Sequence, residues 1–194
     1  MKKYEFTGET RLFLGKTLYQ IKALVSFGSV SVGDLGGWIE NEENLSQDGN
    51  AWVSGNAKVY GKAEVSGNAE VSGNAWVLGN AKVSGDAEVS GDAWVSGDAW
   101  VSGNAKVSGD AWVLGNAKVS GDADIMWISK IGSRNDTITF MKSRELNIIV
   151  NVGCFKGSIE DFEEKVKQTH GENEHAQAYF LAIELAKIRL NLNE

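Results

Sequence analysis

The sequence contains no proline and a single cysteine, Cys154, in 194 residues. One cysteine excludes an intramolecular disulfide framework and suits a reducing compartment. Without proline, the chain must turn at glycine, asparagine and aspartate, which tolerate positive φ angles. No stretch approaches the ~20 apolar residues of a membrane span, and the start, MKKYEFTGET, lacks the apolar segment of a secretory signal. We therefore expect a cytoplasmic protein that makes no membrane contact.

Acidic residues outnumber basic ones, 26 to 19, which gives a net charge of −7. This balance argues against broad binding to the phosphates of nucleic acids, although it allows a local basic site. Hydrophobic residues make up 42% of the chain, a share that is typical of a folded domain and excludes wholesale disorder.

A six-residue repeat dominates the chain. Glycine opens each of thirteen consecutive units from Gly49 to Gly121, and the run ends at Met126. Most units read Gly-Asn/Asp-Ala-x-Val-Ser, and all keep Gly and Ala at the first and third positions. Within a unit, Ala and Val alternate with the variable residue x, so they share one face of a short strand. Six residues are too few for a helix–turn–helix repeat, but they fit one side of a triangular parallel β-coil.

This pattern resembles the hexapeptide-repeat family, whose fold is the left-handed parallel β-helix with three hexads per coil. The resemblance covers residues 49–126 and implies about 4–5 coils, each rising by the ~4.8 Å spacing of neighbouring strands. The preceding GGWIE…ENLS segment, residues 36–46, is similar to a bacterial and phage branch of that family. That similarity implies an N-terminal cap.

The flanks of the repeat differ from it in kind. We expect residues 1–48 to form an N-terminal β cap and an irregular first coil that begins near Gly37. Residues 127–194 are expected to form a ββαα cap. Its strands would be 137–142 and 147–155, with one helix starting at Ser158 and a second running from about 174 to 190. The predicted fold is thus mainly β: a left-handed β-helix, residues 49–126, between two caps.

One side of the coil is predicted to be apolar. Every third hexad falls on the same side, so residues 18 positions apart stack. Trp76, Trp94 and Trp112 form one such column, with Leu78 and Leu114 beside it. The column could stabilise the strand ladder of a monomer, or it could be buried between subunits. We favour a homotrimer, the assembly that is common in the family.

The second predicted helix carries two apolar stripes. Tyr179 and Phe180 lie on one stripe, and Leu181, Leu185 and Ile188 lie on the other. A helix with two apolar faces must be covered on both faces. The expected subunit interface therefore comprises Trp76, Leu78, Trp94, Trp112, Leu114, Tyr179 and Phe180.

The repeat lacks the groups that catalysis in this family requires. Acyltransferases that share the fold need a general-base histidine near the coil, but residues 49–126 contain none and no inserted loop. His170 and His175 could serve as metal ligands, but their places near helix ends favour a capping role. Cys154 lies in an apolar run and is expected to be a buried thiol. We predict no catalytic residue, no metal site and no cofactor.

One polar segment is a candidate ligand site. Lys130, Gly132, Ser133 and Arg134 lie between the repeat and the predicted hairpin. Backbone N–H groups at Gly132 and Ser133, with the two positive charges, could hold a phosphate or carboxylate. The alternative is an ordinary connection in which Arg134 pairs with Asp136, and Asn135 or Asp136 makes an Asx-turn.

These observations favour a non-catalytic binding protein. Its partner would be a host protein or an anionic small molecule such as a nucleotide, and the phage resemblance implies a phage or prophage origin and inhibition of host defence. One alternative is an acyl- or nucleotide-sugar-dependent transferase with its active site between subunits. The other is a purely structural module.

Overall fold

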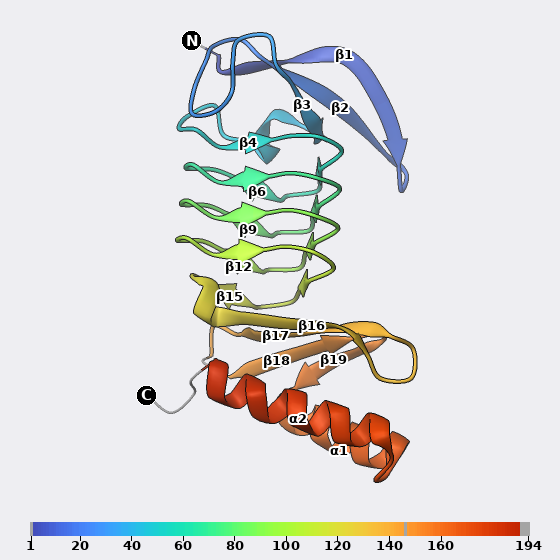
Figure 1. Ribbon diagram of the computed structural model, residues 1–194. Coiled ribbons are helices and arrows are strands. Elements are labelled where there is room, and N and C mark those ends of the chain that lie inside the picture. The colour runs from blue at the N-terminus through green and yellow to red at the C-terminus, as the bar shows by residue number, and fades with distance from the viewer. Residues whose placement is uncertain (1, 146, 191–194) are drawn as a thin grey trace.

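The computed structural model describes residues 2–145 and 147–190 (Figure 1). An N-terminal hairpin, a stack of β-coils and a C-terminal sheet with two helices follow one another along a single axis. The predicted parallel β-helix is confirmed. No helix in the described ranges is long and apolar enough to cross a membrane.

Short strands on the three sides of the coil form three parallel sheets. In the longest sheet, five turns of the solenoid contribute β3 (Leu35–Ile39), β5 (Lys58–Val59), β8 (Trp76–Val77), β11 (Trp94–Val95) and β14 (Trp112–Val113). The second holds β4 (Trp52–Val53), β7 (Glu70–Val71), β10 (Glu88–Val89) and β13 (Lys106–Val107), and the third holds β6 (Glu64–Val65), β9 (Lys82–Val83), β12 (Trp100–Val101) and β15 (Lys118–Val119). The register is 18 residues, because Trp94 pairs with Trp76 on one side and Trp112 on the other.

The repeat gives the solenoid its core and its corners. Its Ala and Val side chains point inward, and Val77 and Val95 are fully buried. The corner glycines adopt positive φ angles, as Gly91 does at 68°. A Cβ on Gly91 would lie 2.8 Å from the backbone nitrogen of Gly109 in the next coil. Glycine is therefore needed at the corners both for conformation and for space.

The first coil begins in β3, as predicted. Ile39 pairs in parallel with Val59, and Leu45 forms an isolated parallel bridge to Val65. Ile39, Leu45 and Ala51, which are six residues apart, are all fully buried. The irregular leader thus already follows the hexad spacing of the core.

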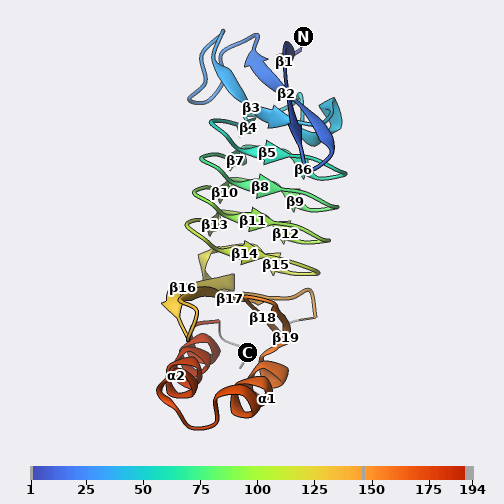
Figure 2. The same cartoon turned by 90° about the vertical axis from the view of Figure 1, so that its right-hand side faces the viewer.

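The N-terminal hairpin closes the top of this coil and also extends along its side. β1 (Tyr4–Phe13) and β2 (Lys16–Ala23) are antiparallel, and β2 pairs with β3. Leu14 and Gly15 both have positive φ angles and form a two-residue turn. The tip of the hairpin lies beside the side of the coil that carries β5 and β8 (Figure 2).

Two polar side chains are buried at this end of the solenoid. Asn44, in the 3-10 helix η1 (Glu42–Asn44), donates to the carbonyl oxygens of Gly61 (3.1 Å) and Ala63 (2.8 Å). The Lys3 ammonium donates to the carbonyl oxygen of Ala51 (2.9 Å), and burial lowers the pKa of Lys3 to about 8. Side chains therefore pair with carbonyl groups that the end of the coil would otherwise leave unpaired.

The C-terminal cap has four strands where the sequence predicted two. β16 (Ile125–Ile131), β17 (Asp136–Lys142), β18 (Ile148–Val152) and β19 (Phe155–Ser158) form an antiparallel sheet in that order. The last hexad, 121–126, departs from the coil as the 3-10 helix η2 (Asp122–Asp124) and the start of β16. Gly153, at φ 55°, turns the predicted single strand 147–155 into a hairpin.

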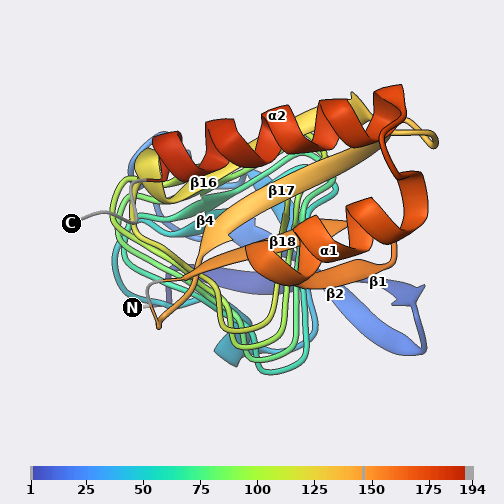
Figure 3. The same ribbon diagram turned by 90° about the horizontal axis from the view of Figure 1, so that it is seen from below.

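Two helices cover the face of this sheet that points away from the solenoid (Figure 3). α1 (Ile159–His170) begins after Ser158, whose hydroxyl accepts the N–H of Asp161, and Gly171 caps its end. α2 (Glu174–Arg189) begins after Asn173. The predicted helix start at Ser158 is confirmed.

Candidate functional site

The segment predicted to bind an anion forms a tight hairpin turn in the cap. Lys130 lies near the end of β16, and residues 132–135 connect β16 to β17. The N–H of Asn135 donates to the carbonyl oxygen of Gly132 (3.3 Å). The sequence had placed this segment at the junction of coil and cap. Because β16 occupies that junction, the turn lies at the far end of the hairpin.

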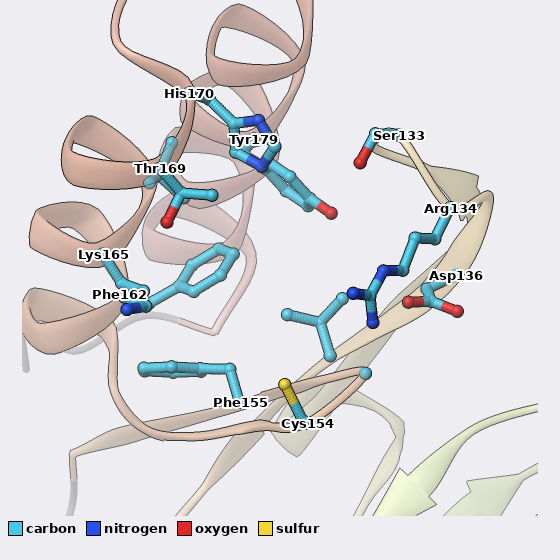
Figure 4. A pocket seen from close by; sticks show the side chains of 13 residues that line it. Ser133, Arg134, Asp136, Cys154, Phe155, Phe162, Lys165, Thr169, His170 and Tyr179 are labelled. Carbon is cyan, nitrogen blue, oxygen red and sulfur yellow. The ribbon is translucent and has the colours of Figure 1, made fainter.

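This turn borders a cavity of about 220 Å³, here named the cap pocket (Figure 4). The β18–β19 turn, α1 and α2 supply its other walls. Its lining residues are Ser133, Arg134, Asp136, Val152, Gly153, Cys154, Phe155, Phe162, Lys165, Val166, Thr169, His170 and Tyr179.

Two of the four predicted ligand residues, Ser133 and Arg134, line the cap pocket. Lys130 and Gly132 lie outside its wall. A Cβ on Gly132 would collide with the Tyr179 hydroxyl, so glycine at this position lets the turn pack against α2. The role of Gly132 here is therefore close packing.

The floor of the pocket is aromatic. Phe162 lies 5.1 Å from Phe155 and 5.3 Å from Tyr179, measured between ring centroids. Burial raises the pKa of the Tyr179 hydroxyl, Asp136 raises it further, and Arg134 opposes that effect. Tyr179 thus stays protonated at neutral pH and can donate a hydrogen bond.

Positive charge borders this apolar floor from two sides. The Arg134 side chain comes from the β16–β17 turn, and Lys165 comes from α1 (Figure 4). No ion pair among the described residues joins Arg134 to Asp136. The ion pair of the alternative is therefore not formed, although residues 132–135 do make an ordinary hydrogen-bonded turn.

The histidines and the cysteine lie at or near the same pocket. His170 ends α1, and its ring centroid is 5.8 Å from those of both Tyr179 and His175. The described residues include no group of three His, Cys, Asp or Glu side chains that could hold a metal ion. The prediction of a buried Cys154 is wrong, because the turn that Gly153 makes exposes the thiol at the pocket rim.

Sequence reasoning missed the α1 side of the pocket. Phe162, Lys165, Val166 and Thr169 are three, four and seven residues apart and share one helix face. That spacing was readable in the sequence. Its contact with the turn around Arg134 depends on tertiary packing, which no local pattern reports.

The tryptophan column is present, and its upper part is covered by the chain itself. Ring centroids of Trp94 lie 4.8 Å from Trp76 and 5.2 Å from Trp112. Phe13, at the tip of the hairpin, meets Trp76 edge-on at 4.6 Å. Leu78, like Phe13, packs against the buried side chains of Leu18, Trp38 and Tyr60. Trp112 remains 38% exposed.

The expected interface on α2 is also partly internal. Tyr179 is 8% exposed and packs in the core of the cap, whereas Phe180 is half-buried. The other stripe, Leu181, Leu185 and Ile188, is exposed. The two apolar faces of this helix are therefore confirmed, and the trimer stays a prediction.

No family model matches this chain. A segment is 38% identical over 61 residues to YdcK of Escherichia coli strain K12, which is named an uncharacterized acetyltransferase. The match covers 27% of this chain and 19% of that protein. This similarity is consistent with the repeat in the sequence and the solenoid in the structure. The repeat and the solenoid have the form of hexapeptide-repeat proteins.

Proposed function

We propose that this protein is a non-catalytic binding protein whose cap pocket holds a small anion with an apolar part. The solenoid is the rigid support that presents the cap. The main observation that supports this proposal is that Arg134 and Lys165 lie at the edge of an apolar floor, which Phe155 and Phe162 form. Apolar pockets with a few convergent polar groups are the usual form of small-molecule sites.

The chemistry of the lining defines the ligand class. A phosphate, sulfonate or carboxylate would lie between the guanidinium and the ammonium, since charge-assisted hydrogen bonds are the strong ones. Ser133, Thr169 and Tyr179 offer hydroxyl groups at the same pocket. An aromatic or aliphatic part would contact the phenylalanine rings, so a nucleotide belongs to the class. In biological terms, the proposal is that a phage or prophage protein captures a nucleotide signal of its host.

A fluorescence titration with 8-anilinonaphthalene-1-sulfonate tests the proposal. This aromatic anion has the proposed chemistry, and its emission rises in apolar surroundings. We expect saturable binding at one site per chain. The Arg134→Gln/Lys165→Gln variant should bind about tenfold more weakly, because each substitution removes a charged hydrogen-bond donor.

The matched control is Arg189→Gln, which removes an exposed arginine on α2 away from the cap pocket. It should bind like the wild type, and all three proteins should keep the same circular dichroism spectrum. Equal affinity in the wild type and the double variant would refute the assignment of the anion to this pocket.

An acetyltransferase is the second candidate, and the similarity to YdcK is the observation that favours it. The repeat itself offers no histidine to act as the general base, since residues 49–126 contain none. The residue available in the cap pocket is His170. Steady turnover of acetyl-CoA with an amine or hydroxyl acceptor, lost in His170→Ala, would establish this candidate and overturn the non-catalytic proposal.

A further inference from the structure

A second hollow follows the tryptophan column below the hairpin. We name it the tryptophan groove and define it by Trp94, Trp112, Asp92 and Asp110, which line the lower part of a cavity of about 400 Å³; Lys58, Asn74 and Trp76 line its upper part. It continues toward the cap as a hollow of about 350 Å³ that Asp136 also lines. The groove thus combines indole rings with carboxylates.

Elsewhere the chain places its own cations on its tryptophan rings. The Arg11 guanidinium lies 4.3 Å from the ring centroid of Trp38, and that of Arg144 lies 4.4 Å from Trp100. Lys58 lies 5.6 Å from the Trp76 ring, at the top of the column. Among the described residues, no such cation lies over Trp94 or Trp112.

The carboxylates beside these two rings also lack a cation. Asp92 accepts a hydrogen bond from the Asn74 amide (3.0 Å), and no ion pair of the described chain uses Asp92 or Asp110. These aspartates occupy the same corner in successive coils, which are ~4.8 Å apart. Two like charges at that spacing repel each other and favour a cation beside them. The enclosed indole N–H of Trp94 has no acceptor within the described residues.

From this geometry we propose that the tryptophan groove binds an extended basic segment of a partner protein. Arginine or lysine side chains would lie over Trp94 and Trp112 and pair with Asp92 and Asp110. Cation–π contact and charge pairing then act on the same side chain.

Charge selects this occupant over a second copy of the chain. The protein carries a net charge of −7, so self-association at this groove would bring an acidic surface to acidic side chains. Phe13 already covers the upper part of the column at Trp76. The proposal therefore replaces, for this face, the self-association that the sequence predicted.

A defined peptide tests the proposal. Successive tryptophans are one coil rise apart, so about three or four residues of extended chain at ~3.3 Å each cover the groove. The probe is a capped heptapeptide in which arginine alternates with alanine. The control peptide carries citrulline, which keeps the shape of arginine and removes its charge. Isothermal titration calorimetry at low salt compares the two.

We expect the arginine peptide to bind at least about tenfold more tightly than the citrulline peptide, with an affinity that falls as salt is added. Asp92→Asn/Asp110→Asn should lose about tenfold in affinity. Asp86→Asn is the matched control, because Asp86 accepts from Asn68 (2.9 Å) at a corner outside the groove. It should leave binding unchanged.

Two experiments can overturn the proposal. In calorimetry, either of two outcomes would do so: equal affinity for the arginine and citrulline peptides, or an unchanged affinity in the double aspartate variant when that variant melts like the wild type. The other experiment is light scattering on the wild type and Trp112→Glu. A wild-type oligomer that dissociates on this exposed substitution would show that a second copy fills the groove.

Discussion

Replacing Asn44 with aspartate should lower the free energy of unfolding by about 3–5 kcal/mol, because it breaks a fully satisfied buried network. The Asn44 side chain is fully buried. Its amide nitrogen donates to Gly61 and Ala63, and its oxygen accepts the backbone N–H groups of Glu40 (3.1 Å) and Asn41 (3.0 Å). An ionised aspartate has no donor, so two carbonyl oxygens would face a buried carboxylate.

Chemical denaturation of Asn44→Asp against wild type measures this loss. The pH dependence has a defined sign, because burial raises the folded-state pKa of the new carboxyl above its unfolded value of ~3.9. The variant should therefore lie closest to the wild type below that pH, where the protonated acid can donate, and fall behind as pH rises. Asn56→Asp, at an exposed corner beside Lys58, should change stability by less than about 0.5 kcal/mol. Equal stability of Asn44→Asp and wild type at neutral pH would contradict the described network.

A methyl group at a solenoid corner should be almost as costly. We expect Gly91→Ala to lower the free energy of unfolding by about 3 kcal/mol or more, because strain from a positive φ adds to a steric clash. The new Cβ would lie 2.8 Å from the backbone nitrogen and 3.2 Å from the carbonyl oxygen of Gly109. Neither atom can move without displacing the next coil.

Gly171→Ala separates the two contributions. Gly171 also has a positive φ, 58°, but nothing lies within 4 Å of its added Cβ. Its conformation, φ 58° and ψ −116°, is one that alanine rarely adopts, so the substitution should cost about 1–2 kcal/mol from strain alone. Thermal and urea unfolding of both variants measure the difference. Equal losses at the two positions would mean that neighbouring coils are not in close contact at the corners.

The solenoid was predictable because its information is local and repeated. Each hexad contains the glycine that forms a corner and the Ala and Val that point inward. The 18-residue spacing of stacked positions then places Trp76, Trp94 and Trp112 in one column. The caps carry no such repetition. Residues 121–126 look like another hexad in the sequence, yet they leave the coil where the cap sheet begins. Local pattern cannot show which unit is the last.

The candidate site was predicted only in part. The charged turn around Arg134 stood out, because it is the first segment after the repeat with glycine and two cations. The opposite wall of the pocket is formed by α1. The sequence predicted this helix correctly, but it did not indicate that the helix packs near the turn. The contact between Phe13 and Trp76 was not predicted for the same reason, because tertiary packing sets the direction of the hairpin that carries Phe13. The hydrogen-bond network of Asn44 was not predicted either. It lies in residues 36–46, whose similarity to a branch of the family implied only an N-terminal cap.

The alkylation rate of Cys154 tests the proposed function most directly. It is the only cysteine of the chain and its thiol lies exposed at the rim of the cap pocket. With 8-anilinonaphthalene-1-sulfonate at about ten times its Kd, about a tenth of the pocket stays free, so iodoacetamide should react about tenfold more slowly. The Arg134→Gln/Lys165→Gln variant should show little protection at the same concentration. An unchanged rate in wild-type protein that has bound the anion saturably would contradict binding in the cap pocket.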